Sequence, residues 1–503
     1  MSPRTPSAGQ EHPSRPWRNW ADNQSAIPSR TLAPDGLDQI IDAVTTAVRS
    51  GLTVKVAGSG HSFSDIARPE GVLLTLQSQA APLAADPDTG LVTVQAGITL
   101  RTLNRFLWTH GLALPNLGDI DAQTVAGAVC TASHGTGVHH HGLASQLRSF
   151  DLVLADGSVQ RCSASIGPQL FDLGRVSLGA LGVLTTVSLQ CEPAFWLHAV
   201  QATMPLDELT ARVDELIDGN EHFEFFWFPD TEIAVTKQNN RADHPQQTRS
   251  RIAEWVSDEL LANAGFELLC RLGRSAPRLV PSLNRLSSHS MSADYTAPAP
   301  AVFTSPRRVR FLEMEYAVPR AATREALTGI RQAATRYARD VTFPVEVRFA
   351  AADDIPLSMA YGRDTTYFAV HVYRGQPHQQ YFQEVEATLT DLAGRPHWGK
   401  LHTKTARHLR AVYPRYDEFR ALRDRLDPAR VFRNSYLDPR PSPRPRPGAV
   451  DDPDKLDGRR ILTKGRPKTS PPRRIGVIVN GSRILSSSAD FYAACRRLAC
   501  HCR

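Results

Sequence analysis

Two glycine-rich stretches constrain this chain more than any other feature of its sequence. The first, VAGSGHSFSD (residues 56–65), follows a short β-branched run, and the second, GDIDAQTVAGAVCTASHGTG, covers residues 118–137. A glycine loop after a strand exposes backbone N–H groups to an anion without obstruction from side chains. Two such loops predict a cradle for a long ligand with a pyrophosphate in its middle; the alternative is a pair of unrelated turns. The first loop lacks the third glycine of GxGxxG, and no GxxxxGK[ST] occurs, so neither a Rossmann fingerprint nor a P-loop is supported.

Hydrophobic periodicity predicts short helices and strands in alternation up to about residue 195. Apolar residues at helical spacing predict a helix over residues 35–50, and Thr99 can cap a second helix that ends at Gly111. Asp156-Gly157 is a hairpin turn. The predicted strands of this part are TVKVAG, LLTL, LVTVQAG and the two arms of FDLVLADGSVQRC.

A second, sheet-bearing domain is predicted after residue 195, where aromatic and alternating segments become frequent. Residues 241–300 indicate helix followed by loop, and a further helix is predicted over residues 416–432. The predicted strands of this part are HFEFFWFP (222–229), RFLEMEYAVP (310–319), VTFPVEVRFAA and DTTYFAVHVYRG.

The two ends of the chain differ in composition from its body. Residues 1–14 lack the apolar core of a signal peptide and predict a disordered leader. Residues 441–503 are rich in Pro and Arg, cannot bury a core and predict a disordered tail. From Asp438 to Arg503 there are 15 Lys and Arg against six Asp, so the formal charge of +7 belongs to this segment. The body is close to neutral, and we therefore expect no nucleic-acid partner.

Localisation is predicted from what the sequence lacks. No apolar run approaches the roughly 20 residues that cross a bilayer. We therefore expect a cytoplasmic protein, and peripheral membrane association stays open. The seven cysteines show no disulfide framework.

Two other chemistries find little support in the sequence. His134 and the run His139–His141 lie close together, but no acidic residue stands at ligand spacing and HEXXH is absent, so no metal site is predicted. A run of three histidines is usually a solvated loop. A serine hydrolase needs a nucleophile elbow, and GxSxG does not occur.

Four charged or titratable residues late in the chain fit an oxidation site. Glu346 and Arg348 alternate on one predicted strand, so they share a face. His371 lies in another strand between two valines, and Lys400 follows Trp398-Gly399. Taken singly, each fits an ordinary salt bridge or hydrogen bond. Together they supply fixed positive charge, a carboxylate that orients hydroxyls, and a base.

These motifs resemble, in order, those of the vanillyl-alcohol-oxidase-type flavoproteins, and within them the sugar-lactone oxidases and dehydrogenases. VAGSGHSFSDIA and GDIDAQTVAGAVCTASHGTG look like the two FAD loops, and HFEFFWFP, EVRF, RPHWGK and LDPARVFRNSYL match later landmarks. The resemblance covers residues 15–437 and implies an α+β fold. Its parts are a two-subdomain FAD-binding domain of the vanillyl-alcohol-oxidase/PCMH type (15–195), a substrate or cap domain with an antiparallel sheet flanked by helices (196–394), and a C-terminal segment that returns to the FAD domain (395–440).

The resemblance implies FAD as the cofactor. His61 stands where many members bond covalently to the 8α-methyl group of the flavin, and other members bind FAD without that bond. Asp119 falls at a serine position of the alditol oxidases, which leaves its role open. The implied cofactor-binding residues are Ala57, Gly58, Ser59, Gly60, His61, Ser62, Asp119, Thr124, Gly127, Thr131, Ala132, Ser133, His134, Gly135 and Val183.

The resemblance also implies a reaction. Glu346, Arg348, His371 and Lys400 match the active-site positions of the alditol oxidases. The C2 hydroxyl of L-gulono-1,4-lactone or D-arabinono-1,4-lactone would be oxidised by hydride transfer to flavin N5, giving an ascorbate-type product. Glu346 would hold substrate hydroxyls, His371 would remove the hydroxyl proton, and the two cations would stabilise negative charge. Oxygen, cytochrome c or a quinone-type acceptor would take the electrons. The alternatives are an alditol oxidase and a non-catalytic flavin- or sugar-binding protein.

Overall fold

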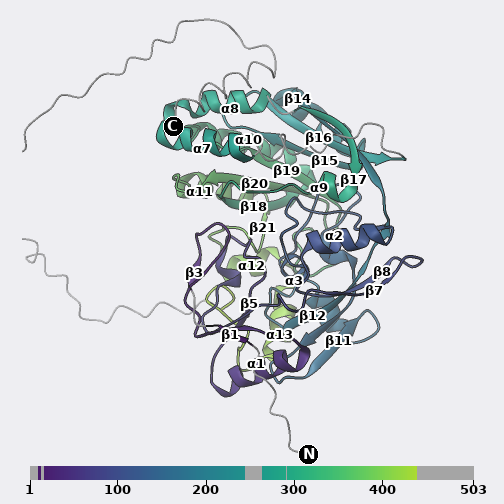
Figure 1. Cartoon of the computed structure of the whole chain (residues 1–503). Helices are drawn as coiled ribbons and strands as arrows, with labels where there is room; N and C mark the ends of the chain where they lie inside the picture. Colours follow the sequence, from purple (N-terminus) through teal and green to yellow (C-terminus); the bar gives the residue numbers. More distant parts are fainter. Residues whose placement is uncertain (1–9, 13–15, 244–262, 290–291, 439–503) are drawn as a thin grey trace, which may run out of the picture. The chain divides into compact units, whose positions relative to one another are not determined.

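Residue 195 separates two kinds of sheet in the computed structural model, which describes residues 10–12, 16–243, 263–289 and 292–438 (Figure 1). A four-stranded and a five-stranded sheet precede it, and an eight-stranded antiparallel sheet follows it. Helices accompany all three sheets, which confirms the predicted α+β class. Sheet membership changes between β13 (Glu192–Pro193) and β14 (Trp196–Pro205), and we propose the domain boundary there.

One strand of the first sheet leads directly into the first glycine loop. Helix α1 (Leu37–Arg49) connects β4 to β5 and buries Ile40 and Val44 in a core with Val54 and Leu74. Strand β5 pairs in parallel with β6 and ends where the loop begins. The sheet has the order β1 (Gln10–His12), β4 (Arg30–Ala33), β6 (Val72–Leu74), β5 (Val54–Val56). A short ribbon of β2 (Trp17–Arg18) and β3 (Ser25–Ala26) precedes it.

The second sheet is antiparallel and flanks the second glycine stretch. Thr99 caps α2 as predicted, because its side chain accepts a hydrogen bond from the Thr102 N–H. The predicted hairpin is formed by β10 and β11. The elements are β7 (Pro82–Asp86), β8 (Leu91–Gln95), α2 (Leu100–Thr109), β9 (Leu112–Ala113), α3 (Val125–Cys130), β10 (Leu147–Val153), β11 (Val159–Ser163), α4 (Pro168–Gly174) and β12 (Val183–Gln190).

The third sheet carries most of the charged residues that the sequence singles out. Its order is β17 (Ala293–Pro298), β14, β16 (Ile233–Ala242), β15 (His222–Trp227), β19 (Val345–Ala350), β20 (Thr365–Tyr373), β18 (Phe311–Pro319), β21 (Arg395–Pro396). The helices of this part are α5 (Leu206–Asp218), α7 (Phe266–Ser275), α8 (Val280–His289), α9 (Ala299–Phe303), α10 (Thr323–Arg336) and α11 (Gln379–Asp391) (Figure 1).

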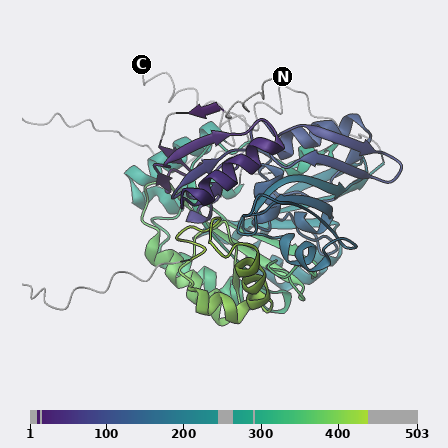
Figure 2. The ribbon, with the colours of Figure 1, turned by 90° about the horizontal axis from the view of Figure 1, so that it is seen from below.

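The C-terminal segment returns to the first part of the chain, where its last helix packs against α4 and the residues after that helix reach the first sheet (Figure 2). It contains α12 (Ala406–Val412) and α13 (Tyr416–Leu426). The backbone N–H of Val54 donates to the carbonyl of Val431 at 2.8 Å. The buried Asn434 side chain donates to three carbonyls, of Asp65, Ile66 and Arg68. These contacts hold the segment beside the first glycine loop.

Three predictions about local structure were wrong. Helix α13 ends at Leu426 and not at residue 432, because Pro428 disfavours helical geometry in Asp427, whose carboxylate instead accepts hydrogen bonds from the Val431 and Phe432 N–H groups. The segment 241–300 contains a strand, β17, which pairs with β14. Gln10–His12 pairs with the open edge of β4, so this part of the expected leader is a strand. Residues 1–9, residues 13–15 and the predicted tail lie outside the described residues.

Among the described residues, no helix has both the length and the apolar character required to cross a membrane.

Candidate active site

The first glycine loop presents a run of unpaired backbone donors. The Ala57 N–H donates to the Leu74 carbonyl and the Phe63 N–H to that of Gly399. Between them, the N–H groups of residues 58–62 donate to no acceptor among the described residues. Gly60 adopts φ = +73°, which turns the loop. Successive free N–H groups form a concave site that binds an anion such as a phosphate group.

The two predicted loops contact each other directly. A Cβ atom on Gly58 would lie 2.4 Å from Thr124 Oγ1, so only glycine fits here. The Ser59 hydroxyl donates to the Ala122 carbonyl. Thr124 caps α3, and its Oγ1 accepts a hydrogen bond from the Gly127 N–H at 3.1 Å. The structure therefore brings together the two stretches that the sequence predicts as one cradle.

The far end of the second stretch is equally crowded. A Cβ atom on Gly135 would lie 2.2 Å from Asn116 Oδ1. Ala132 adopts a left-handed φ of 59°, and the Thr131 hydroxyl donates to the Gly127 carbonyl. Ser133 Oγ lies within hydrogen-bond reach of Gln123. These contacts fix the backbone that leads to His134.

His61 has a buried nitrogen with no partner. Its ring stacks on Trp20 with the ring centroids 5.2 Å apart, and Nδ1 is inaccessible to solvent and makes no hydrogen bond to the described residues. Burial, followed by the charge of Lys400, lowers the pKa of His61 to about 4. The ring is therefore neutral near pH 7 and keeps a nitrogen lone pair. The next residue, Ser62, lies against Gly399, whose Cβ would be 3.2 Å from Ser62 Oγ.

Val183 lies apart from the charged residues. It begins β12 opposite Val153 and packs in the same core as Val54 and Leu74, behind the first glycine loop.

Strand register places the charged residues of the third sheet on one face. Arg348 on β19 lies opposite Glu224 on β15, and Glu313 on β18 lies opposite His371 on β20. Tyr367 shares the face of His371 by alternation and stacks on His134 from the second glycine stretch, with ring centroids 3.6 Å apart. This face therefore meets the glycine loops.

Arg348 is surrounded by three carboxylates. Its Nε donates to Glu224 Oε2 at 2.7 Å, its Nη2 lies 2.5 Å from Glu346 Oε1, and it also bonds to Asp119. Asp119 takes a second partner in Arg307. The fork geometry of a guanidinium suits such multiple pairing. The structure thus gives Asp119 a role that the sequence left open, as a link from the second glycine stretch to β19.

Glu346 differs from the other buried carboxyls of this face. Burial, opposed by Arg348, leaves its pKa raised, whereas the cations beside Asp119 lower the pKa of that carboxyl against the effect of burial. Glu346 Oε1 is also buried without a hydrogen bond in acceptable geometry among the described residues. Glu346 is therefore the carboxyl of this group that the protein itself satisfies least.

Lys400 and His371 share one carboxylate. Lys400 Nζ lies 2.5 Å from Glu313 Oε1, and His371 Nε2 lies 3.6 Å from the same oxygen. His371 Nδ1 lies 3.0 Å from the Pro344 carbonyl, which can only accept, so Nδ1 carries a proton. In the neutral ring, Nε2 then keeps its lone pair. Burial raises the pKa of Glu313, but Lys400 outweighs it and holds that pKa at about 2.

His134 is held between two acceptors. Its Nδ1 lies 2.9 Å from the Gly135 carbonyl and its Nε2 lies 2.5 Å from Glu315 Oε1. The Gly135 carbonyl and the Glu315 carboxylate both accept hydrogen bonds, so a partner fixes each of the two ring nitrogens of His134. Tyr367 covers one face of this ring.

Sequence reasoning missed several members of this charge network. They are Glu313 and Glu315 on β18, Glu224 on β15, Lys237 on β16, which lies 2.8 Å from Glu224, and Arg307. For the residues that lie on strands, the sequence did contain a signal. A carboxylate inside an otherwise apolar strand is expected to be buried, and a buried carboxylate must be paired. The partner of each could not be read without the register of the strands.

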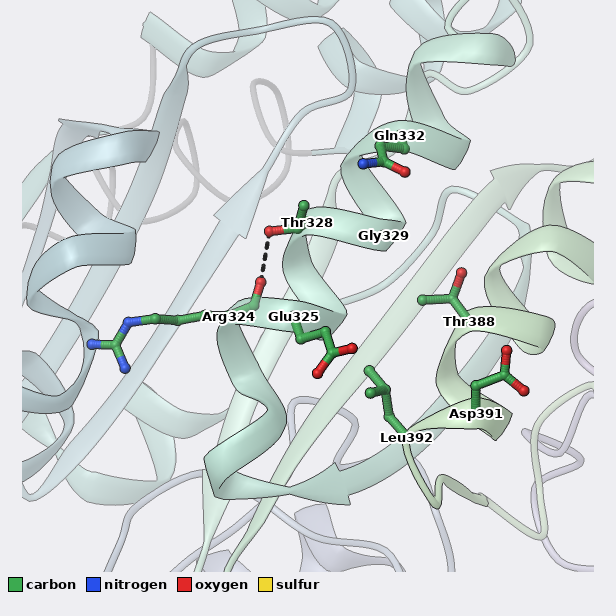
Figure 3. A pocket seen from close by; sticks show the side chains of 8 residues that line it. All are labelled: Arg324, Glu325, Thr328, Gly329, Gln332, Thr388, Asp391 and Leu392. Carbon is green, nitrogen blue, oxygen red and sulfur yellow. Dashed lines mark hydrogen bonds between the residues drawn. The ribbon is translucent and has the colours of Figure 1, made fainter.

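Two surface cavities differ in their relation to this site. One, of about 490 Å³, lies between α10 and α11 and is lined by residues such as Arg324, Gly329 and Asp391 (Figure 3). None of the charged residues above lines it, and we assign it no role. The other, of about 470 Å³, is lined by Trp20, Ser59 and Arg310 among others, and so touches the first glycine loop. Its position makes it the more relevant cavity.

Comparison with known proteins gives family matches over both parts of the chain. The family model described as D-arabinono-1,4-lactone oxidase matches residues 187–439, and the model described as FAD binding domain matches residues 28–163. The chain is 44% identical over 421 residues to L-gulono-1,4-lactone dehydrogenase of Mycobacterium tuberculosis, covering 84% of this chain and 97% of the relative. It is 33% identical to L-gulonolactone oxidase of Mus musculus, with 84% and 97% covered, and 32% identical to an alditol oxidase of a Streptomyces species, with 83% and 97% covered.

Solved structures agree on the fold. Cholesterol oxidase from B. sterolicum superposes with a TM-score of 0.73 at 17% sequence identity, covering 87% of this chain and 98% of that chain. A solvent-stable cholesterol oxidase gives a TM-score of 0.72 at 20% identity, with 84% and 97% covered. This likeness confirms the α+β fold that the motifs predict.

The residues present fit FAD. The unpaired N–H groups of residues 58–62 suit a pyrophosphate, and Gly58 and Gly135 allow the close packing that holds the two loops in place. His61 Nδ1 is a buried polar atom that needs a partner from outside the described chain.

Gly58→Ala should reduce FAD binding. The new Cβ would overlap Thr124 Oγ1 and push the two loops apart. We expect purified G58A to carry less than about half the wild-type ratio of absorbance at 450 nm to that at 280 nm, since a shift of the loop loses several charge-assisted hydrogen bonds. The matched control is Gly36→Ala, because Gly36 has an extended backbone and a Cβ there meets nothing within 4 Å. Equal flavin content in the two variants would contradict the assignment of this loop.

Proposed function

This chain belongs to the D-arabinono-1,4-lactone oxidase family of FAD-linked sugar-lactone oxidoreductases, and we propose that it oxidises L-gulono-1,4-lactone or D-arabinono-1,4-lactone at the C2 hydroxyl. The observation that carries the proposal is the convergence of Glu346, Arg348, His371 and Lys400 on the sheet face that meets the glycine loops. The relatives named for gulonolactone support the choice of substrate class.

Glu346 is the group proposed to hold the substrate. Its carboxyl is buried, is not satisfied by the described residues, and neighbours the guanidinium of Arg348. A sugar lactone offers several hydroxyl donors, and hydrogen bonds to a carboxylate in a buried site are stronger than those in water. Arg348 itself is held by Glu224 and Asp119, so it cannot swing away when a substrate enters.

His371 is the proposed base. The Pro344 carbonyl holds Nδ1–H, so Nε2 is the atom that can take the proton of a substrate hydroxyl. Glu313, 3.6 Å from Nε2, would stabilise the imidazolium that forms. Bound FAD supplies the acceptor for the hydride that leaves the same carbon.

Arg348 and Lys400 are proposed to stabilise negative charge that develops during the reaction. Although burial alone would lower it, Glu313 and Glu315 keep the pKa of Lys400 raised, so the amine stays charged. Lys400 is placed beside the first loop because the Phe63 N–H donates to the Gly399 carbonyl at 2.7 Å. Such charges need no rearrangement at the moment of reaction.

An alditol is the second candidate substrate. The alditol oxidase relative covers the chain almost as completely as the lactone enzymes do. Asp119, which falls at a serine position of the alditol oxidases, is a carboxylate in this chain and is paired with Arg348 and Arg307. The site therefore differs from that of the alditol oxidases at this position. We prefer the lactones because the relatives with higher identity are named for them.

A substrate panel tests the proposed function. Under anaerobic conditions, L-gulono-1,4-lactone or D-arabinono-1,4-lactone should bleach the flavin absorbance near 450 nm of the purified holoenzyme within seconds, while xylitol and sorbitol should act at least tenfold more slowly. Faster bleaching by the alditols would favour the second candidate, and no bleaching by any of them would reject both. Reoxidation by oxygen and by cytochrome c, followed in the same cell, identifies the acceptor.

His371→Gln should slow flavin reduction without preventing substrate binding. Glutamine retains the approximate size of the ring and a donor toward the Pro344 carbonyl, but it cannot take a proton. Loss of a general base costs about 10² to 10⁴ in rate. We expect this loss in the rate constant for flavin reduction, with the lactone Kd changed less than about fivefold. The comparison variant is His378→Gln, a residue at the start of α11 that lies outside the network. A rate within threefold of wild type would exclude His371 as the base.

A covalent bond between His61 and the flavin is part of the proposal. The neutral ring, with its unpartnered Nδ1, has the lone pair that such a bond requires. The flavin should therefore remain with the protein after precipitation with trichloroacetic acid. In His61→Ala it should be released into the supernatant, while the native variant still binds FAD through the glycine loops. Release from the wild-type protein would show that FAD is bound without a tether.

A further inference from the structure

We propose that His140, Glu221 and His222 form a binding site for a divalent cation of the Zn²⁺ class, separate from the redox site. The sequence argued against a metal because no acidic residue stands near the histidine run at ligand spacing. The fold supplies what the spacing lacks, since Glu221 and His222 at the start of β15 lie beside the loop that follows the second glycine stretch.

The three side chains converge on a small volume. Glu221 Oε1 lies 3.7 Å from His140 Nε2 and 3.8 Å from His222 Nε2, and one ligand atom from each residue lies within 4.8 Å of the other two. The centre of a triangle with sides of about 4 Å is about 2.3 Å from each corner, close to Zn–N and Zn–O distances of about 2.0–2.2 Å. Gly137 allows this approach, because a Cβ there would lie 2.7 Å from the His140 ring.

His222 is already prepared as a ligand. The side chain is fully buried, and its Nδ1 lies 2.8 Å from the Thr136 carbonyl, which makes Nδ1 the protonated nitrogen. Nε2 therefore carries the lone pair, and it has no hydrogen-bond partner among the described residues. A histidine whose other N–H donates to a backbone carbonyl is the usual arrangement around a bound metal.

The local charge also suits a cation. Arg241 Nε lies 2.7 Å from Glu221 Oε1, and its Nη2 lies 2.6 Å from Glu192. The two carboxylates of Glu221 and Glu192 face one guanidinium, which leaves a net negative charge beside the two imidazole rings.

Binding requires a small adjustment of His140. Its ring stacks on that of His222 with the ring centroids 4.3 Å apart and an interplanar angle of 14°, so a single cation cannot lie in the planes of both rings as they stand. The backbone of His140 is held by hydrogen bonds to Gly137 and Ala351, while its side chain keeps 15% of its surface exposed. A rotation of this ring about its side-chain bonds would turn Nε2 toward Glu221 and open coordination positions to water.

In the two other clusters of potential ligands, the space between the side chains is taken by contacts within the protein. His134 and Glu315 bond to each other, and His397 Nδ1 accepts a hydrogen bond from the Gly399 N–H, which leaves its proton on Nε2. In the third cluster, the carboxylates of Asp119, Glu224 and Glu346 surround the guanidinium of Arg348. Of the three clusters among the described residues, that of His140, Glu221 and His222 is the one with a buried histidine nitrogen that has no hydrogen-bond partner.

A cation here would join the loop of residues 137–140 to β15. That strand also carries Glu224, which bonds to Arg348. Binding should therefore stabilise the contact between the two parts of the chain on which the redox site depends, in proportion to RT ln(1 + [Zn²⁺]/Kd).

The test is a Zn²⁺ titration of tag-free, full-length holoenzyme that has been treated with EDTA and dialysed. Isothermal titration calorimetry should show a site that His140→Ala abolishes or weakens at least tenfold, and a rise of Tm with ZnCl₂ that the same variant loses. Glu221→Gln should weaken binding as well and serves if H140A folds poorly, which its flavin spectrum reveals.

The matched control is His139→Ala, which removes the exposed neighbouring imidazole and should bind as the wild type does. Since Cys495, Cys500 and Cys502 offer thiolates elsewhere in the chain, the difference between H139A and H140A, and not the total binding, carries the result. Equal Zn²⁺ binding by these two variants, or no Zn²⁺ binding by the wild type, would overturn the proposal.

Discussion

The pairing of Arg348 with three carboxylates is the interaction on which the rest of this structure depends. It joins β19 to β15 through Glu224 and to the second glycine stretch through Asp119. A buried guanidinium without partners would be strongly destabilising, and breaking such a pair typically costs about 3–5 kcal/mol. If the sheet face and the glycine loops separated, charged side chains would be exposed to solvent or left buried without a partner. This requirement fixes where a substrate can lie relative to the cofactor.

The glycine loops impose the complementary constraint. Gly58 and Gly135 lie so close to Thr124 and Asn116 that no side chain fits. This packing leaves the N–H groups of residues 58–62 without partners among the described residues, whereas the third sheet carries buried charged side chains on the face that meets the second glycine stretch. One part of the chain thus offers uncharged backbone N–H groups and the other offers ionised side chains. An anionic dinucleotide suits the first surface and a polyhydroxylated substrate suits the second.

The sequence predicts those parts of the site that depend on local pattern. Period-two alternation places Glu346 and Arg348 on one face, and the glycine content of two stretches predicts the cradle. Alternation cannot say which strand lies alongside, so the pairing of Glu313 with His371 and of Glu224 with Arg348 is invisible until the register is known. The same limit hid Glu221, which lies about 80 residues from the histidine run that it approaches. The early end of α13 has a local cause that the sequence does contain, because Pro428 disfavours helical geometry in Asp427.

The charge balance of the buried network explains why one carboxyl is left for the substrate. Five carboxyls, those of Asp119, Glu224, Glu313, Glu315 and Glu346, face the cations Arg307, Arg348, Lys237 and Lys400, and Glu315 also bonds to the ring of His134. Four of these carboxyls have their pKa lowered by their cationic neighbours, although burial opposes the shift, and that of Glu346 alone is raised. Neighbouring Asp119 and Glu224 repel its charge, and Arg348 is shared among all three. Hydroxyl donors would compensate for the burial of Glu346, so a polyol or lactone is the kind of ligand that completes this network.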